Sequence, residues 1–234
     1  IPTVLGGTVL QPRLLEVTRG LPVSKPLTGV TVVQPETLAV VGAFGSITEN
    51  TTVLDATVPW LRISTTGGTS TFPSSGTPAN VVNVSVDGTG AAFGVTLPSF
   101  GTQLTGELRT SNNGAIVQSG ANSQIRATTV TIAGGISTMT AGDLFVTGNF
   151  SVTGTGRYVA TAPHTTNFDG DVLPQVVGPM PFDTLQSSFG NLRFFTVNGG
   201  PSDSITSSLP IRGYLLLDNN RLAGSKAVLQ VRAS

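Results

Sequence analysis

Short stretches in which apolar and polar side chains alternate recur along the whole chain. The clearest runs from Val82 to Asp87 and places three valines on one face and three polar residues on the other. Residues 129–132 and 149–152 show the same alternation. A period of two residues is that of a β-strand with one buried face, so we expect strands at these positions.

Two further stretches, residues 192–197 and 227–231, are apolar on both faces, which is typical of central strands between two layers. Turn residues separate the strand candidates at short intervals. They stand at residues 67–68, 74–76, 87–88, 112–114, 134–135 and 198–200. Short strands joined by such turns predict an all-β protein, an antiparallel β-sandwich of jelly-roll or immunoglobulin-like type.

Very little helix is expected. The best candidate is residues 181–192, where Pro181 suits a first turn and Asp183 is a possible cap. Gly190 lies inside this stretch and limits the helix to about two turns.

The chain divides into three predicted segments. Residues 1–33 contain Pro2, Pro12, Pro22 and Pro26, and proline is confined to the edges and bends of sheets. This segment is predicted to be an extended N-terminal arm that crosses its own body or a neighbouring subunit, or else an ordinary edge strand with a loop. Residues 34–112 form a β-sandwich unit, and residues 113–234 form a second β unit or continue one large sandwich.

Charge is scarce: only 10% of the 234 residues are charged, against about 25% in typical soluble domains. Twelve cationic and twelve acidic residues give a net charge of zero, with no cluster of cations for nucleic acid. A weakly charged surface does little to keep copies of a protein apart, which favours subunits that assemble side by side.

Several classes of protein are excluded by what the sequence lacks. It has no cysteine, so thiolate catalysis, cysteine-bound metals and disulfides are ruled out. No apolar run approaches the about 20 residues that a membrane-spanning helix needs. The sequence begins at Ile1 and shows no signal peptide, so we expect a processed or trimmed start.

One part of the chain resembles a known family. Pro59, Trp60 and Leu61, then the Ser/Gly/Pro turn of residues 74–79 and the alternating strand 82–87, stand in the order found in bacterial immunoglobulin-like modules of the BACON type. Gly101, Thr102, Thr105 and Gly106 follow, and the resemblance covers residues 34–112. It implies an immunoglobulin-like sandwich on an extracellular protein, and carbohydrate binding has been proposed for the family. Residues 67–72 and 91–100 depart from its usual spacing.

Candidate catalytic chemistry depends on His164, which is the single histidine. A Ser-His-Asp type of triad would have to use it, and Thr165, Thr166 and Asp169 are its neighbours. No G-x-S-x-G elbow is present, so we interpret His164 as a surface residue in a Pro/Thr-rich loop. The acids are scattered and predict no carboxylate pair for glycoside hydrolysis. We therefore expect no enzyme activity and no cofactor.

A calcium loop is a second candidate. Asn167, Asp169 and Asp171 alternate around Gly170 and offer oxygen ligands of the kind that Ca²⁺ prefers. The closing Glu of an EF-hand is missing, so a plain Asp-Gly turn is the preferred interpretation and no metal is assigned.

Two surface features remain open. The sequons at Asn50, Asn83 and Asn149 are glycosylation candidates, or chance occurrences in a sequence rich in Ser and Thr. Trp60 either stacks on a sugar or anchors the core, and its apolar neighbours favour the core.

Taken together, these features predict a non-enzymatic structural subunit of a virion or an extracellular surface, whose partners are copies of itself. It is a viral capsid, coat or projecting spike protein, or a cell-surface fibre, with a host receptor or glycan as a possible further partner. No nucleic-acid contact and no membrane span are expected. The alternative is a secreted immunoglobulin-like adhesion or carbohydrate-binding module.

Overall fold

A computed structural model of the chain contains strands and no helix among the residues that it describes, so the all-β prediction is confirmed. The described residues are 8–10, 13–18, 30–33, 36–41, 58–64, 68–71, 81–88, 91–95, 102–103, 106–170, 175–180, 187–194 and 204–217.

The strands form three long parallel sheets. Sheet I has nine strands: β2 (Leu14–Thr18), β4 (Thr37–Val41), β5 (Val58–Ser64), β7 (Val81–Asp87), β10 (Glu107–Ser111), β13 (Thr129–Ile132), β16 (Phe150–Val152), β19 (Val176–Val177) and β21 (Ser204–Ile205). Sheet II has five: β6 (Gly68–Thr71), β8 (Ala91–Val95), β11 (Ala115–Gln118), β14 (Ile136–Met139) and β17 (Arg157–Ala160). Sheet III has six: β9 (Thr102–Gln103), β12 (Gln124–Ala127), β15 (Asp143–Val146), β18 (Thr165–Phe168), β20 (Asn191–Phe194) and β22 (Leu215–Leu217). A separate pair joins β1 (Thr8–Leu10) to β3 (Val30–Val33).

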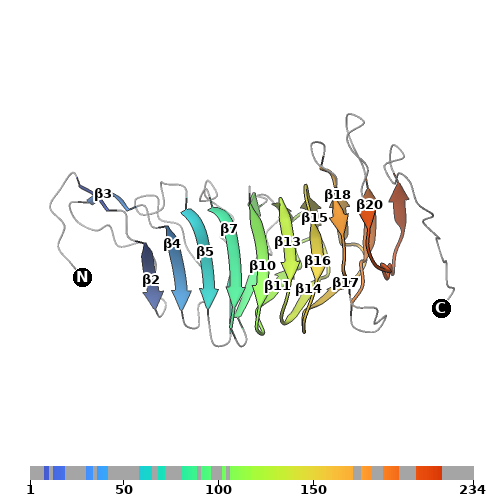
Figure 1. Cartoon of the computed structure of the whole chain (residues 1–234), viewed down its shortest axis with the longest axis horizontal. Helices are drawn as coiled ribbons and strands as arrows, with labels where there is room; N and C mark the ends of the chain where they lie inside the picture. Colours follow the sequence, from blue (N-terminus) through green and yellow to red (C-terminus); the bar gives the residue numbers. More distant parts are fainter. Residues whose placement is uncertain are drawn as a thin grey trace.

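The chain winds as a β-solenoid of about 5 turns, in which a complete coil gives one strand to each of the three sheets. Figure 1 shows the strands stacked along the long axis of the molecule. The prediction of an antiparallel sandwich is therefore wrong. Alternation specifies which face of a strand is buried, but it does not specify which strand lies beside it.

The turns predicted at 87–88, 112–114 and 134–135 are confirmed, but their role was misinterpreted; Gly68 begins β6, and 74–76 and 198–200 lie outside the described residues. Gly88, Asn112 and Gly135 have positive φ values of 129°, 53° and 65°, which glycine and asparagine tolerate best. Each lies between a strand of sheet I and the next strand of sheet II. These turns bend the chain into the neighbouring sheet, whereas a hairpin would return it antiparallel.

A column of buried side chains runs through sheet I and carries the repeat of the solenoid. Its register joins Leu61, Val84, Leu108, Val130 and Phe150, all 0–1% exposed. Their positions in the chain differ by 20 to 24 residues, the length of one coil. Our sequence analysis missed this repeat. It was the signal that would have identified a solenoid.

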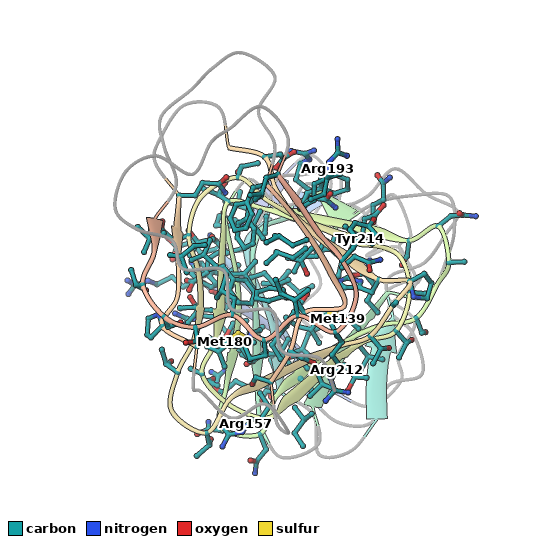
Figure 2. All side chains as sticks on the ribbon, turned by 90° about the vertical axis from the view of Figure 1, so that its right-hand side faces the viewer. Met139, Arg157, Met180, Arg193, Arg212 and Tyr214 are labelled. Carbon is teal, nitrogen blue, oxygen red and sulfur yellow. The ribbon has the colours of Figure 1, made fainter. Side chains whose placement is uncertain are left out.

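The core is one continuous cluster enclosed by the three sheets, and Figure 2 looks down its axis. One part of it is aromatic: the Phe150 ring centroid lies 5.1 Å from that of Tyr158, 6.0 Å from Phe168 and 5.3 Å from Phe189. Rings at these separations and tilts pack favourably beyond their simple burial.

The predicted helix at 181–192 is wrong in its described part, and residues 181–186 lie outside the described residues. Ser188 pairs with Val159 of β17, and Asn191 and Leu192 begin β20. Phe189 is fully buried in the core. A β carbon at Gly190 would contact the backbone of Thr161 and His164 in the preceding coil. Close stacking of coils thus decides the conformation of this segment.

The other predicted elements have mixed outcomes. Strands were expected at 82–87, 129–132, 149–152 and 192–197, and β7, β13, β16 and β20 confirm them in their described parts. The strand expected at 227–231 lies outside the described residues. The division into 1–33, 34–112 and 113–234 stays a prediction.

Candidate functional site

His164 lies inside the solenoid, in the turn between β17 and β18. Its side chain is 0% exposed, so the interpretation as a surface residue is wrong. The turn places the imidazole between coils: Nδ1 is 3.3 Å from the carbonyl oxygen of Ala141 in the preceding coil. The backbone oxygen of His164 accepts a hydrogen bond from the Asn191 amide of the following coil, at 2.8 Å. His164 therefore connects three successive coils.

Two hydroxyl groups complete the surroundings of the imidazole. The Tyr158 hydroxyl is 3.1 Å from His164 Nε2 and 2.8 Å from Thr166 Oγ1. Because Nδ1 faces a carbonyl, it carries the hydrogen, and the bare Nε2 accepts from Tyr158. Thr166 then donates to the Tyr158 oxygen. A neutral imidazole satisfies every polar atom of this cluster, which we call the His164 cluster.

Burial sets the protonation states of the cluster. It lowers the pKa of His164 to about 4, although the backbone groups of Ala141 and Gly142 act in the opposite direction. Burial also raises the pKa of the Tyr158 hydroxyl, and the hydrogen bond with Thr166 offsets part of this increase. Both groups are therefore neutral at pH 7, and the cluster has the character of a structural hydrogen-bond network.

The structure does not bring the candidate triad together. The carboxylate of Asp169 forms an ion pair with Arg126, at 2.7 Å between Nη1 and Oδ2. Thr165 lies half-buried on the outer face of β18, opposite in direction to the buried Thr166. An imidazole without solvent contact has no route to a substrate, so this geometry does not support acyl transfer at His164.

The described candidate calcium ligands, Asn167 and Asp169, have other contacts. Asn167 is 3% exposed, and its Nδ2 is 3.5 Å from the Thr165 carbonyl oxygen. Asp169 binds Arg126, and Asp171 lies outside the described residues. No group of three or more acidic, histidine or cysteine side chains suited to a metal occurs in the part of the chain that the structure describes.

The outer face of sheet I is polar and includes Trp60. Trp60 is half-buried there, because its neighbours Leu61 and Ile63 take the inward positions, and so its interpretation as a core anchor is wrong. The guanidinium of Arg109, two strands away, lies 4.5 Å from the centre of the Trp60 ring. Such cation–π contacts stabilise exposed sites by about 0.5–1 kcal/mol.

A polar ladder follows at the end of these strands. Arg62 donates to Asp87 at 2.9 Å, and Asn112 of the next coil donates to the same carboxylate. Burial acts to raise the pKa of Asp87, but the bonds from Asn112 and Arg62 outweigh it, so the pKa is lowered. The ladder links successive coils by hydrogen bonds, and in it the positive charge of Arg62 is balanced by the carboxylate of Asp87.

The outer face of sheet III is also charged. Arg126 pairs with Asp169 and covers the Phe145 ring at 4.8 Å. Asp143 is half-buried beside them, and burial raises its pKa despite hydrogen bonds from Thr165 and Asn167. Figure 2 shows Arg193, from β20 of this sheet, at the periphery of the molecule.

The outer face of sheet II differs from the other two. On β11, β14 and β17 its outward residues are Ala115, Val117, Ile136, Thr138, Arg157 and Val159. Ile136 is 61% exposed, the largest fraction among the exposed large hydrophobic residues of the described chain. Arg157 is the one charged residue of this set. We call these six residues the sheet II outer face, and sequence analysis did not single them out.

Comparison with known proteins gives no relative. No protein-family model matches the chain, and neither the curated proteins nor the solved structures contain a match. The BACON-type resemblance has no support from these comparisons. No described helix is long and apolar enough to cross a membrane.

Proposed function

We propose that the chain is a non-enzymatic structural subunit that assembles with copies of itself through the sheet II outer face. The single observation that supports this most is the exposed Ile136 in a nearly uncharged row of β-branched and small side chains. The setting that we propose is a virion or an extracellular surface, as a projecting spike, coat protein or fibre.

Contact between like faces is physically favourable here. A two-fold contact brings the same patch of each subunit together, so a patch with a net charge meets the same net charge. The sheet II outer face avoids this repulsion over β11 and β14, where it has no charged residue.

The size of the face predicts a weak individual contact. Strands lie about 4.8 Å apart and rise about 3.3 Å per residue, so the three strands of four residues that carry these side chains cover roughly 190 Å². A stable pairwise interface buries about 800 Å² on each partner. One such contact therefore does not hold a dimer, and a particle with many repeated contacts is the form that this face suits.

The test compares Ile136→Asp with Thr131→Asp, a matched change on the outer face of sheet I. Light scattering and electron microscopy over a range of concentrations measure particle size. We expect the unaltered chain and Thr131→Asp to form large particles, and Ile136→Asp to remain monomeric. Monomers at all concentrations for the unaltered chain would reject the proposal.

One observation favours a second candidate function, a glycan-binding or adhesion module. Trp60 is half-buried on a polar outer face with the Arg109 guanidinium over its ring, and aromatic rings beside polar groups suit sugars. A glycan array distinguishes it: Trp60→Ala would abolish the binding of a sugar and leave particle size unchanged.

A further inference from the structure

Two of the three sequons occupy equivalent positions in the solenoid. Asn83 and Asn149 each stand immediately before an inward residue of sheet I. The Oδ1 atom of each accepts an amide hydrogen from the following coil, from Glu107 at 2.7 Å and from Val176 at 3.0 Å. The orientation of both carboxamides is thereby fixed, and the surroundings of Nδ2 distinguish the two sites.

The Nδ2 atoms differ in what they contact. Asn83 is half-buried, and its Nδ2 donates to the Pro59 carbonyl oxygen at 2.9 Å. Asn149 is exposed, and its Nδ2 has no hydrogen-bond partner among the described residues. A group attached to Nδ2 would displace a bond between coils at Asn83, whereas at Asn149 it would point into solvent.

The serine at the third position of each sequon shows the same contrast. Ser85 is 5% exposed and accepts a hydrogen bond from Arg109 Nε at 3.3 Å. The same guanidinium lies over Trp60, so the Arg109 side chain covers the Asn83 sequon on the outer face of sheet I. Ser151 is half-buried on the outer face, two residues from Asn149 and on the same side of β16.

We propose that Asn149 is an acceptor of an N-linked oligosaccharide and that Asn83 is not. In the transfer, Nδ2 forms a bond to the anomeric carbon of a lipid-diphosphate-linked oligosaccharide. The bond from that carbon to the phosphate oxygen breaks, the lipid diphosphate leaves with the electron pair, and a base of the transferase takes the Nδ2 proton. The inference rests on the proposed extracellular setting. The glycan would then project from the outer face of sheet I, and the sheet II outer face would remain free for assembly.

The experiment expresses the full chain behind a secretion leader in a glycosylating eukaryotic host. Every variant also carries Asn50→Gln, because Asn50 lies outside the described residues. The mass of the secreted protein is measured before and after treatment with an N-glycosidase. We expect one glycan, lost in Asn149→Gln and retained in Asn83→Gln.

A second variant separates the acceptor role of Asn149 from its bond to Val176. Ser151→Ala destroys the sequon and keeps the asparagine, so it should also remove the glycan. Secreted protein without a glycan, or a glycan that survives Asn149→Gln, would overturn the inference. Light scattering on the same samples tests the proposed function separately. A glycosylated monomer would reject assembly and leave Asn149 as the acceptor. Particles without a glycan would reject Asn149 as the acceptor and leave assembly untouched.

Discussion

The hydroxyl of Tyr158 lies 3.1 Å from Nε2 of His164, in the interior of the solenoid where neither side chain meets solvent. Tyr158 projects from β17, and His164 comes six residues later, in the turn that leads to β18. Their contact gives the buried imidazole its one short hydrogen bond at Nε2. The stability of this coil therefore depends on a polar pair inside the core.

Removal of the Tyr158 hydroxyl should destabilise the fold. Tyr158→Phe leaves Nε2 of His164 with only the longer contact to Thr166, at 3.4 Å. A buried acceptor that loses its partner costs about 1–3 kcal/mol. Urea denaturation should show this loss, whereas Tyr214→Phe, at a tyrosine that is 53% exposed, should change the free energy of unfolding by less than about 0.5 kcal/mol.

Acid should weaken the fold through His164. Its pKa is about 4 in the folded chain and 6.5 when unperturbed, so the unfolded state binds the proton more tightly. Stability is then lost as the pH falls from about 6.5 to about 4, by about 3 kcal/mol in total. The free energy of unfolding, measured against pH, should fall less steeply over this range in His164→Gln. Equal slopes in the two proteins would show that His164 does not contribute.

Two glycines should respond differently to alanine. A β carbon at Gly134 would collide with the backbone of Asn112 in the preceding coil, and backbone cannot move aside cheaply. Gly154 is less crowded, because its β carbon would meet only the Ala133 carbonyl oxygen at 3.0 Å, and its φ of +55° costs an L-residue about 1–2 kcal/mol. Thermal unfolding should therefore show a loss of about 3 kcal/mol for Gly134→Ala and a smaller one for Gly154→Ala. The reverse order would contradict the close stacking of these coils.

Two phenylalanines, one in the core and one on an outer face, allow a matched comparison of their contributions to stability. Phe150 is fully buried among Tyr158, Phe168 and Phe189. Phe150→Ala should cost about 3–5 kcal/mol in chemical denaturation, because it leaves a cavity in the aromatic part of the core. Phe145→Ala, on the outer face of sheet III beneath Arg126, should cost clearly less. Similar losses at both positions would mean that Phe145 is also part of the core.

Much of the local structure could be predicted from the residues themselves. The alternation at 82–87 identified β7, and Asn112 and Gly135 identified turns, since these signals depend only on neighbours in the chain. The inward position of Leu61 and Ile63 also determined that Trp60 faces outward, although we weighted its apolar neighbours and expected a core residue.

The candidate site was less accessible from the sequence. Nothing local shows that the turn holding His164 folds into the core, because its partners Ala141 and Asn191 lie more than twenty residues away. The contrast between Asn83 and Asn149 likewise depends on Pro59, Glu107 and Val176 in neighbouring coils. Both sequons look alike when read along the chain.

The sequence by itself determined that this chain is built of short strands with one buried face, separated by turns, and that charged residues are scarce in it. Only the tertiary structure decided that the strands lie parallel, coil upon coil, and that β11, β14 and β17 of sheet II share an outer face with a single charged residue. The physical reason is that alternation acts between residues two apart, whereas strand pairing depends on the register between residues 20 to 24 apart. Leu61, Val84 and Leu108 carry that register, and it becomes visible once they are stacked on one another.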